Sequence, residues 1–201
     1  MPQPQISIFT CSHNNPGHIA VVINTVLRQT FPHFEYFILE HSTDGITRGI
    51  ISNFTDPRIK IVEEEAQDES YLKNKYFPQA RGKYIMILSD NDILMTNCFQ
   101  EHMEDFEMNK NARAYYHAIE VIYTYNNQPG YQIPAKTLFG PALNPDGQID
   151  LGALMFERSL LDSIPHPLFG TDESFINHLA RITEIYPMKP ALHIKRMTYG
   201  S

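Results

Sequence analysis

Short apolar runs alternate with helix-like segments along the first half of the chain, and this alternation restricts the possible folds more than any other feature. Strands are expected at 6–9 (ISIF), 34–39 (FEYFIL), 57–62 (PRIKIV) and 83–88 (KYIMIL). Helices are expected at 17–29, 44–54, 69–80 and around 99–106. Strands that alternate with helices predict a mostly parallel sheet with helices on both faces.

The second half is less regular. The stretch ARAYYHAIEVIYTY (112–125) predicts a long strand, and ALHIK (191–195) a final short one. Helices are expected at 158–164 and 172–182, whereas the proline-rich segment 126–150 predicts loops with short strands. No linker divides the chain, so we expect one domain over residues 1–201.

Composition narrows the class of protein. A chain of 201 residues with 42% hydrophobic residues is long enough to bury a core. Its formal charge of −7 argues against nucleic acid as a partner. Cys11 and Cys98 have no CxxC spacing, which argues against a disulfide framework or a structural zinc site. No apolar stretch is long enough for a transmembrane segment, so we expect a cytoplasmic location.

Two carboxylates follow the most apolar strand directly. Asp90 and Asp92 come immediately after YIMIL (84–88), and ligands of open α/β sheets bind at the carboxyl ends of strands. Alternate residues can direct two carboxylates at one point, where they would bind Mg²⁺ or Mn²⁺ together with phosphate oxygens. An ordinary turn is the alternative, because Asp and Asn favour turns without any ligand.

A second carboxylate site lies at the start of the helix expected at 172–182. Thr171, Asp172 and Glu173 can serve simply as a helix cap and as favourable charges on the helix dipole. A helix start that faces a cleft can also supply a general base. Both interpretations stay open at this point.

A series of segments, in order and with matching spacing, resembles the family 2 glycosyltransferases, which have the GT-A fold. The segments are ISIFTCSHNNP, VINTVLRQTFPHFEYFILE, STDGIT, DPRIKIV, ARGKYIMILSDND, DLGALMFERSLLDSI and TDESF. The hydroxyl–Asp form of the metal motif, Ser89-Asp90, is most similar to that of a bacterial spore-coat polysaccharide glycosyltransferase.

The resemblance implies an α/β fold of the GT-A, Rossmann-like type, a three-layer sandwich with a mostly parallel central sheet. Residues 1–95 would form a nucleotide-sugar-binding half and residues 96–201 an acceptor-side half. The implied activity is metal-dependent, inverting transfer of a sugar from a UDP-linked donor to a hydroxyl acceptor in polysaccharide or glycan synthesis. The implied partners are the nucleotide-sugar donor, an unknown acceptor and, as an oligomer, further copies of the chain.

Residue roles follow from the same resemblance. Asp90 and Asp92 would hold Mn²⁺ or Mg²⁺, and Asp172 would be the catalytic base. Segment DLGAL (150–154) and the loop 126–148 would shape the acceptor pocket. The residues expected to contact the nucleotide sugar are Cys11, Ser12, His13, Asn14, Glu40, His41, Lys73, Asn74, Asp90 and Asn91.

Departures from the family pattern leave two other classes of protein open. Glu40 and His41 stand where relatives usually have two aspartates, Ser89 replaces the first Asp of the metal motif, and Thr171 replaces a Glu. These changes suit a catalytically impaired, nucleotide-sugar-binding relative. A receiver-type signalling domain fits less well, because its acids follow the first and third strands rather than the fourth.

Overall fold

One mixed sheet organises the chain. The computed structural model describes residues 3–65, 68–125, 136–138, 149–165, 167 and 170–199. Within them, nine strands lie in the order β3-β2-β1-β4-β8-β6-β9-β5, and β7 pairs with β6. The strands are β1 (Ile6–Ser12), β2 (Phe34–Glu40), β3 (Ile59–Glu63), β4 (Tyr84–Ile87), β5 (Ile93–Leu94), β6 (Ala114–Tyr125), β7 (Lys136–Leu138), β8 (Leu154–Glu157) and β9 (Tyr186–Tyr199).

The strands β1 to β4 are all parallel, and helices connect them. The connecting helices are α1 (Ile19–Leu27), α2 (Gly45–Ile51) and α3 (Glu69–Tyr76), the last extended by the 3₁₀ turn η1 (Phe77–Gln79). Local sequence determines where α2 and α3 begin. The Asp44 side chain accepts from the Thr47 N–H at the start of α2, and the Asp68 side chain accepts from the Tyr71 N–H at the start of α3. We call residues 6–88 the parallel half.

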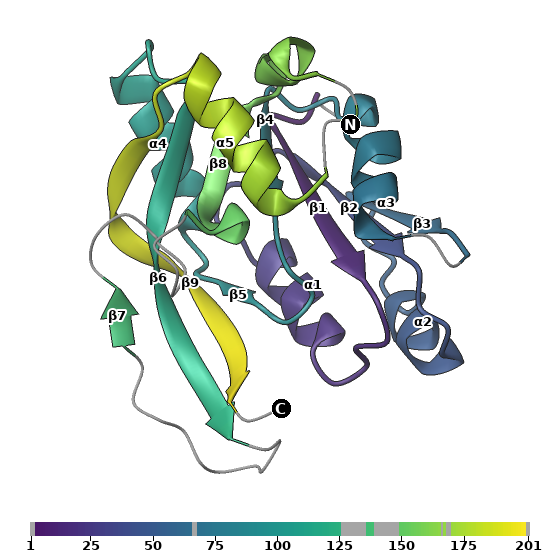
Figure 1. Ribbon diagram of the computed structural model, residues 1–201. Helices are drawn as coiled ribbons and strands as arrows, with labels where there is room; N and C mark the ends of the chain where they lie inside the picture. Colours follow the sequence, from purple (N-terminus) through teal and green to yellow (C-terminus); the bar gives the residue numbers. More distant parts are fainter. Residues whose placement is uncertain are drawn as a thin grey trace.

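The remaining strands form both antiparallel and parallel pairs. β8 runs antiparallel to β4 and β6, whereas β9 runs parallel to β6 over almost its whole length. This pair extends beyond the rest of the sheet in Figure 1. The other elements are α4 (Cys98–Met108), η2 (Leu151–Ala153), η3 (Arg158–Ser163) and α5 (Asp172–Ile182). We call the described residues from 92 to 199 the mixed half.

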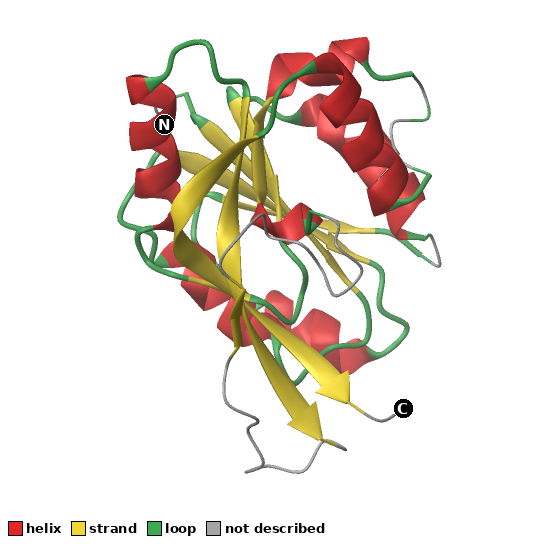
Figure 2. Ribbon diagram, turned by 60° about the vertical axis from the view of Figure 1, so that its left-hand side comes forward, coloured by secondary structure: helices red, strands yellow, loops and turns green. Residues whose placement is uncertain are grey.

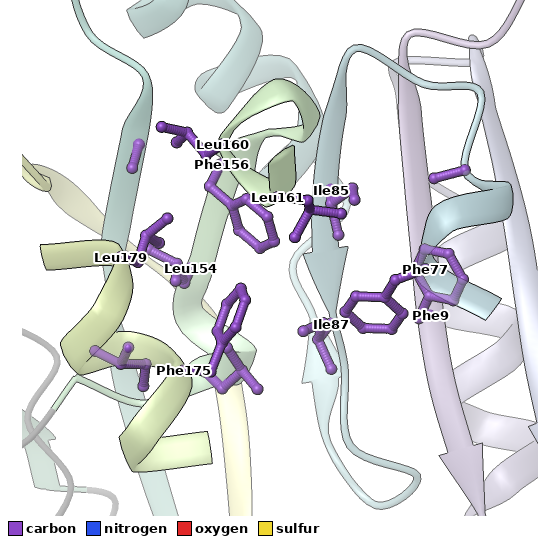
Figure 3. Close-up of a cluster of buried hydrophobic side chains, with 14 of the residues drawn as sticks. Phe9, Phe77, Ile85, Ile87, Leu154, Phe156, Leu160, Leu161, Phe175 and Leu179 are labelled. Atoms are coloured by element: carbon purple, nitrogen blue, oxygen red, sulfur yellow. The ribbon is translucent and has the colours of Figure 1, made fainter. Parts of the chain in front are cut away.

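Helices cover both faces of the sheet, as Figure 2 shows. One core packs α3, η3 and α5 against the sheet, where Phe9 lies 4.3 Å from Phe77 and Phe156 lies 5.4 Å from Phe175 between ring centroids (Figure 3). The other core packs α1 and α4 against the opposite face, through residues such as Val22. Within the described residues, no helix has the length and apolar character needed to cross a membrane.

The expected fold class is confirmed. Helices on both faces of the sheet make three layers, and most of the paired strand residues lie in parallel pairs. Some boundaries were wrong. The helix expected at 69–80 ends at Tyr76, since Pro78 forces a 3₁₀ turn. The segment 158–164 is also 3₁₀, as η3.

Three strands of the mixed half were missed or underestimated. β9 begins at Tyr186 rather than 191, and β5 and β8 were not expected. Each pairs with a partner distant in sequence, and such pairing leaves little local signal. Most of the loop 126–148, expected to shape the acceptor pocket, lies outside the described residues; β7 (136–138) is its described part.

Candidate functional site

The parallel strands β1, β2 and β4 end at one edge of the sheet, and the loops that follow them form the first part of the candidate site. Ser12 lies beside Glu40 in the β1–β2 register, and β4 pairs with the other side of β1. Ligands of open α/β sheets bind at this edge. The structure therefore brings the predicted residues of the segments 11–14, 40–41 and 90–91 to one place.

Asn14 joins the loop after β1 to the loop after β2. Its backbone has a φ of 49°, the left-handed region in which Asn is tolerated. Its side-chain oxygen accepts from the N–H groups of Thr43 (2.9 Å) and Asp44 (3.1 Å), and its own N–H donates to Ser42 Oγ (2.8 Å). Asn14 thus holds the two loops in one conformation.

Histidine stacking adds to this junction. The rings of His13 and His41 stack with centroids 4.7 Å apart, and His13 Nδ1 lies 3.1 Å from the His41 carbonyl oxygen. Glu40 is completely buried, and its Oε1 accepts from the Ser42 N–H (2.7 Å). Ser12 Oγ and Glu40 Oε2 are buried without a hydrogen-bond partner among the described residues. Of these four predicted nucleotide-binding residues, His13 is the exposed one.

Asp90 lies half-buried at the same edge. Its carboxylate accepts from the His13 N–H (3.3 Å) and from Asn15 Nδ2 (3.0 Å). Burial raises the pKa of Asp90, and these two hydrogen bonds oppose that rise. Beside it, Asn91 Oδ1 accepts from Ser89 Oγ (2.8 Å). Asp90 and Asn91 therefore place oxygen atoms at the end of β4.

Asp92 lies elsewhere, and this corrects the expected geometry of the motif. Its side chain is completely buried, and Oδ2 lies 2.9 Å from His193 Nε2 on β9. The cause is strand pairing: Leu94 of β5 lies opposite His193 in the antiparallel register with β9, which turns the chain just after Asn91 inward. The two carboxylates consequently face different partners.

The donor atoms decide how well a metal ion fits here. Mn²⁺ and Mg²⁺ prefer oxygen ligands and keep several sites for water or phosphate. The oxygens of Asp90 and Asn91 at the strand end suit such an ion, whereas Asp92 faces His193. Metal binding by Asp90 and Asp92 stays a prediction, with Asp90 the better-placed ligand.

A cavity of about 270 Å³ opens next to this edge. It extends from the ends of β1 and β4 to η2, α3, α5 and β9, and Cys11 lies on its wall. Burial raises the pKa of the Cys11 thiol, so Cys11 contributes a neutral surface. The polar lining consists of Glu69, Lys73, Ser89, Asp150, Asp172 and Lys195.

Asp172 faces this cavity and pairs with Lys73. The Lys73 Nζ–Asp172 Oδ1 distance is 2.8 Å, and Glu69 lies 3.2 Å from the same ammonium group. Burial alone would lower the pKa of Lys73, but Asp172 and Glu69 raise it above its ordinary value of 10.5. Lys73 therefore stays charged. Next to it in α3, Asn74 Nδ2 donates to the Ser70 carbonyl (2.7 Å).

Thr171, rather than Asp172, caps α5. The Thr171 hydroxyl accepts from the Ser174 N–H (3.1 Å), and the Thr171 N–H donates to Ser174 Oγ (3.0 Å). This reciprocal capping box occupies the N-cap without Asp172. The Asp172 carboxylate is thus available for chemistry at the cavity, with just over half of its side chain exposed.

Sequence reasoning missed a second ion pair in the cavity. Lys195 on β9 contacts Asp150, whose other oxygen accepts from the Gly152 N–H (2.9 Å). Burial would lower the pKa of Lys195, and Asp150 raises it. Asp150 is the first residue of the segment DLGAL (150–154) that was expected to shape the acceptor pocket. No pattern in the sequence marks Lys195, because its partner comes from another element.

Comparison with known proteins relates this arrangement to enzymes of sugar transfer. The family model described as "Glycosyl transferase family 2" matches residues 7–161. Protein CgeD of Bacillus subtilis is 25% identical over 214 residues, covering 97% of this chain and 50% of CgeD. The Escherichia coli UDP-Glc:alpha-D-GlcNAc-diphosphoundecaprenol beta-1,3-glucosyltransferase WfgD is 25% identical, covering 85% of this chain and 67% of WfgD. The chain spans half to two thirds of the length of these relatives.

Solved structures show the same fold at low sequence identity. S. aureus TarS 1-349 in complex with UDP-GlcNAc aligns with a TM-score of 0.73 and 15% identity, covering 98% of this chain and 60% of that one. The mannosyltransferase PcManGT from Pyrobaculum calidifontis, in complex with GDP-Man and Mn²⁺, aligns with a TM-score of 0.70 and 15% identity, covering 96% of this chain and 57% of that one.

Proposed function

The chain belongs to glycosyl transferase family 2 with the GT-A fold, and from this premise we propose that it transfers a sugar from a nucleotide-diphosphate sugar to a hydroxyl group in glycan synthesis. The finer proposal is a UDP-linked donor, a divalent metal ion, inversion at the anomeric carbon and a role in polysaccharide synthesis. The names of WfgD and TarS in its UDP-GlcNAc complex support a uridine donor, whereas PcManGT carries GDP-Man and Mn²⁺.

One observation carries the proposal: a carboxylate that does not cap its helix faces a polar cavity beside the strand ends. Thr171 supplies the cap, which leaves Asp172 for the reaction. Lys73 holds the carboxylate toward the cavity by the 2.8 Å contact. A general base has to lie within hydrogen-bond reach of the hydroxyl group that it deprotonates, and the cavity provides room for that hydroxyl group.

The proposed reaction is a single displacement. Asp172 accepts the proton of the acceptor hydroxyl as its oxygen attacks the anomeric carbon. The bond from that carbon to the donor's phosphate oxygen breaks, and the nucleoside diphosphate leaves with the bonding electrons. Attack opposite the leaving group inverts the anomeric centre.

The reaction also requires positive charge to balance the negative charge of the leaving diphosphate. A divalent ion, held by Asp90 with Asn91 or Asp92, would supply positive charge opposite the diphosphate. The chain's own contribution is the rigid edge: Asn14 holds the loops together, and His13 and Asn15 orient Asp90 through 3.3 and 3.0 Å hydrogen bonds. The ammonium groups of Lys73 and Lys195 lie on the cavity wall, where carboxylates of Glu69, Asp172 and Asp150 pair with them.

The test is the substitution Asp172→Asn, which keeps the size of the side chain and cannot accept the proton. We expect transfer from a UDP-sugar to fall by about 10²-fold or more, while donor affinity measured by calorimetry stays within about threefold. Glu173→Gln is the matched control, because Glu173 is the next carboxylate in the same helical turn and does not line the cavity. Transfer within a few-fold of wild type in Asp172→Asn would exclude Asp172 as the base.

A non-catalytic nucleotide-sugar-binding protein is the second candidate. Two observations favour it: Asp92 is turned toward His193, and Ser89 stands in place of the usual first aspartate. The two candidates differ in turnover. Wild-type protein that binds UDP-sugars in Mn²⁺ but neither transfers nor hydrolyses them would support the second candidate.

A further inference from the structure

A group of three metal-ligating side chains lies buried between α4 and β6, away from the cavity. We call Cys98, His102 and His117 the histidine cluster. Cys98 and His102 are four residues apart on α4 and so share one face of the helix. His117 comes from β6, and all three side chains are completely buried.

The geometry of the cluster is close to that of a metal shell. One ligand atom from each side chain lies within 4.8 Å of the other two. His102 Nε2 and His117 Nδ1 form a 2.9 Å hydrogen bond with each other, which an ion between the rings would replace. Metal–nitrogen bonds of about 2.0–2.1 Å in a tetrahedral shell place two nitrogens about 3.3 Å apart. The two rings would therefore need to separate by less than half an ångström.

The hydrogen bonding of the cluster is incomplete. The outer nitrogens, His102 Nδ1 and His117 Nε2, are buried and have no hydrogen-bond partner among the described residues. A buried polar atom without a partner destabilises the folded state, but an ion held by the inner nitrogens does not give these two outer nitrogens a partner, so the case for an ion rests on the ligand set and its spacing.

From this geometry we propose that the histidine cluster binds one divalent transition-metal ion, with Zn²⁺ as the best match to its ligands. One thiolate and two imidazoles are ligands that zinc and cobalt prefer, whereas Mg²⁺, Mn²⁺ and Ca²⁺ prefer oxygen. The proposal concerns a site separate from the strand edge, and it does not depend on the proposed function.

The protonation states suit this role. Burial lowers the pKa of His102 to about 3 and that of His117 well below 6.5, so both rings are neutral. One inner nitrogen donates its proton in the hydrogen bond between the rings and the other accepts it. On binding, that proton moves to the outer nitrogen of its ring, and both inner lone pairs then face the ion. Burial raises the pKa of the Cys98 thiol, and the ion displaces its proton to solvent as the metal–sulfur bond forms.

A buried histidine–carboxylate pair lies next to the cluster. The His117 and His193 ring centroids are 5.9 Å apart, and His193 Nε2 lies 2.9 Å from Asp92 Oδ2. His117 Nε2 has no hydrogen-bond partner among the described residues, so this pair adjoins the proposed ligands through ring contact alone. This chain of groups also connects the cluster to the loop that carries Asp90.

The test uses untagged wild-type protein freed of metal with a chelator and titrated with Co²⁺. We expect saturation at one ion per chain, with the intense near-ultraviolet charge-transfer absorption of a thiolate–cobalt bond. Elemental analysis of untreated protein after dialysis against excess Mn²⁺ should still show zinc at about one ion per chain. Absence of the charge-transfer band in wild type would overturn the proposal, and this result depends on no variant.

Matched variants then assign the ligands. Cys98→Ser should abolish the band, whereas Cys11→Ser, which removes the other buried cysteine, should keep it. Asp90→Ala should also keep it, since Asp90 belongs to the strand edge. His117→Gln should weaken Co²⁺ binding at least tenfold. Loss of the band in Cys11→Ser, or its retention in Cys98→Ser, would overturn the assignment.

Discussion

The parallel half and the mixed half hold their polar groups by different means. In the parallel half, the loops after β1 and β2 are joined by hydrogen bonds of Asn14, from segments that follow neighbouring strands. In the mixed half, Asp92 meets His193 and Asp150 meets Lys195, each pair from elements far apart in the chain. Loop polarity thus arranges one part of the site, and strand register arranges the other.

The difference is sharpest between two residues of one motif. Asp90 belongs to the parallel half in its contacts, since it accepts from His13 and Asn15. Asp92, two positions later, belongs to the mixed half, because β5 pairs with β9. Two carboxylates only two positions apart therefore lie in different surroundings, Asp90 at the edge where the parallel strands end and Asp92 in the core.

The largest expected effect is on stability at Asp92. Asp92→Ala removes one partner of a buried pair and leaves His193 alone in the core, so we expect the free energy of unfolding to fall by about 3 kcal/mol. Urea unfolding at neutral pH measures it. Asp90→Ala is the matched control and should lose about 1 kcal/mol or less. A larger loss for Asp90→Ala than for Asp92→Ala would contradict the contrast between the two halves.

For nucleotide binding, we expect Asp90→Ala to have a larger effect than Asp92→Ala. Asp90→Ala removes the better-placed oxygen ligand, so we expect UDP affinity in Mn²⁺ to fall at least about tenfold, equivalent to about 1.4 kcal/mol. Wild type should also bind UDP more weakly in EDTA than in Mn²⁺, and Asp90→Ala should lose most of that difference. Calorimetry measures both. Equal affinity of wild type in EDTA and in Mn²⁺ would sink the metal assignment.

The third prediction compares how one buried carboxylate of each half, Glu35 and Asp150, affects the stability of the protein in acid. Glu35 in β2 accepts from Ser7 and Lys60 (both 2.7 Å), and Asp150 pairs with Lys195. Burial would raise both pKa values, but the hydrogen bonds and ammonium groups lower them below the ordinary 4.5 of Glu and 3.8 of Asp.

A lowered folded-state pKa means that each carboxylate stabilises the protein fully above its ordinary pKa, and that this contribution is lost as pH falls through the folded-state value. We expect Glu35→Gln to lose about 1 kcal/mol at pH 7 and to depend less on pH below 4.5. Asp150→Asn should flatten the curve from 3.8 downward. Unfolding free energies across this range test it, and unchanged acid slopes in both variants would contradict these pKa directions.

The smallest expected effect concerns the junction at Asn14. Asn14→Gly permits the φ of 49° but removes the hydrogen bonds to Thr43 and Asp44. We expect the KM for the donor to rise about threefold, with a small loss of stability of about 1 kcal/mol. Asn14→Ala adds backbone strain and should be less stable than Asn14→Gly. If the two variants are equally stable, the left-handed conformation contributes nothing measurable.

The sequence by itself determined the order of strands and helices in the parallel half and the place where its polar residues gather. Hydrophobic periodicity, the caps at Asp44 and Asp68, and the polar loops after strands are local properties, and parallel strands necessarily end at one edge. The sequence also indicated Asp172, but could not separate a cap from a base. The structure assigns the cap to Thr171 and places Asp172 in the first turn of the helix, so the role of Asp172 as a base stays a prediction.

Only the tertiary structure decided that Asp92 is buried, that Lys195 reaches Asp150, and that Cys98 lies beside His102 and His117. The spacing of the two cysteines argued against a structural zinc site. Spacing reports only ligands within one segment, whereas the proposed ligands come from a helix, α4, and a strand, β6. The physical reason is the same in each case. The pairing of β5 with β9 and the packing of α4 against the sheet bring distant residues together, and no local pattern encodes contacts between elements far apart in the chain.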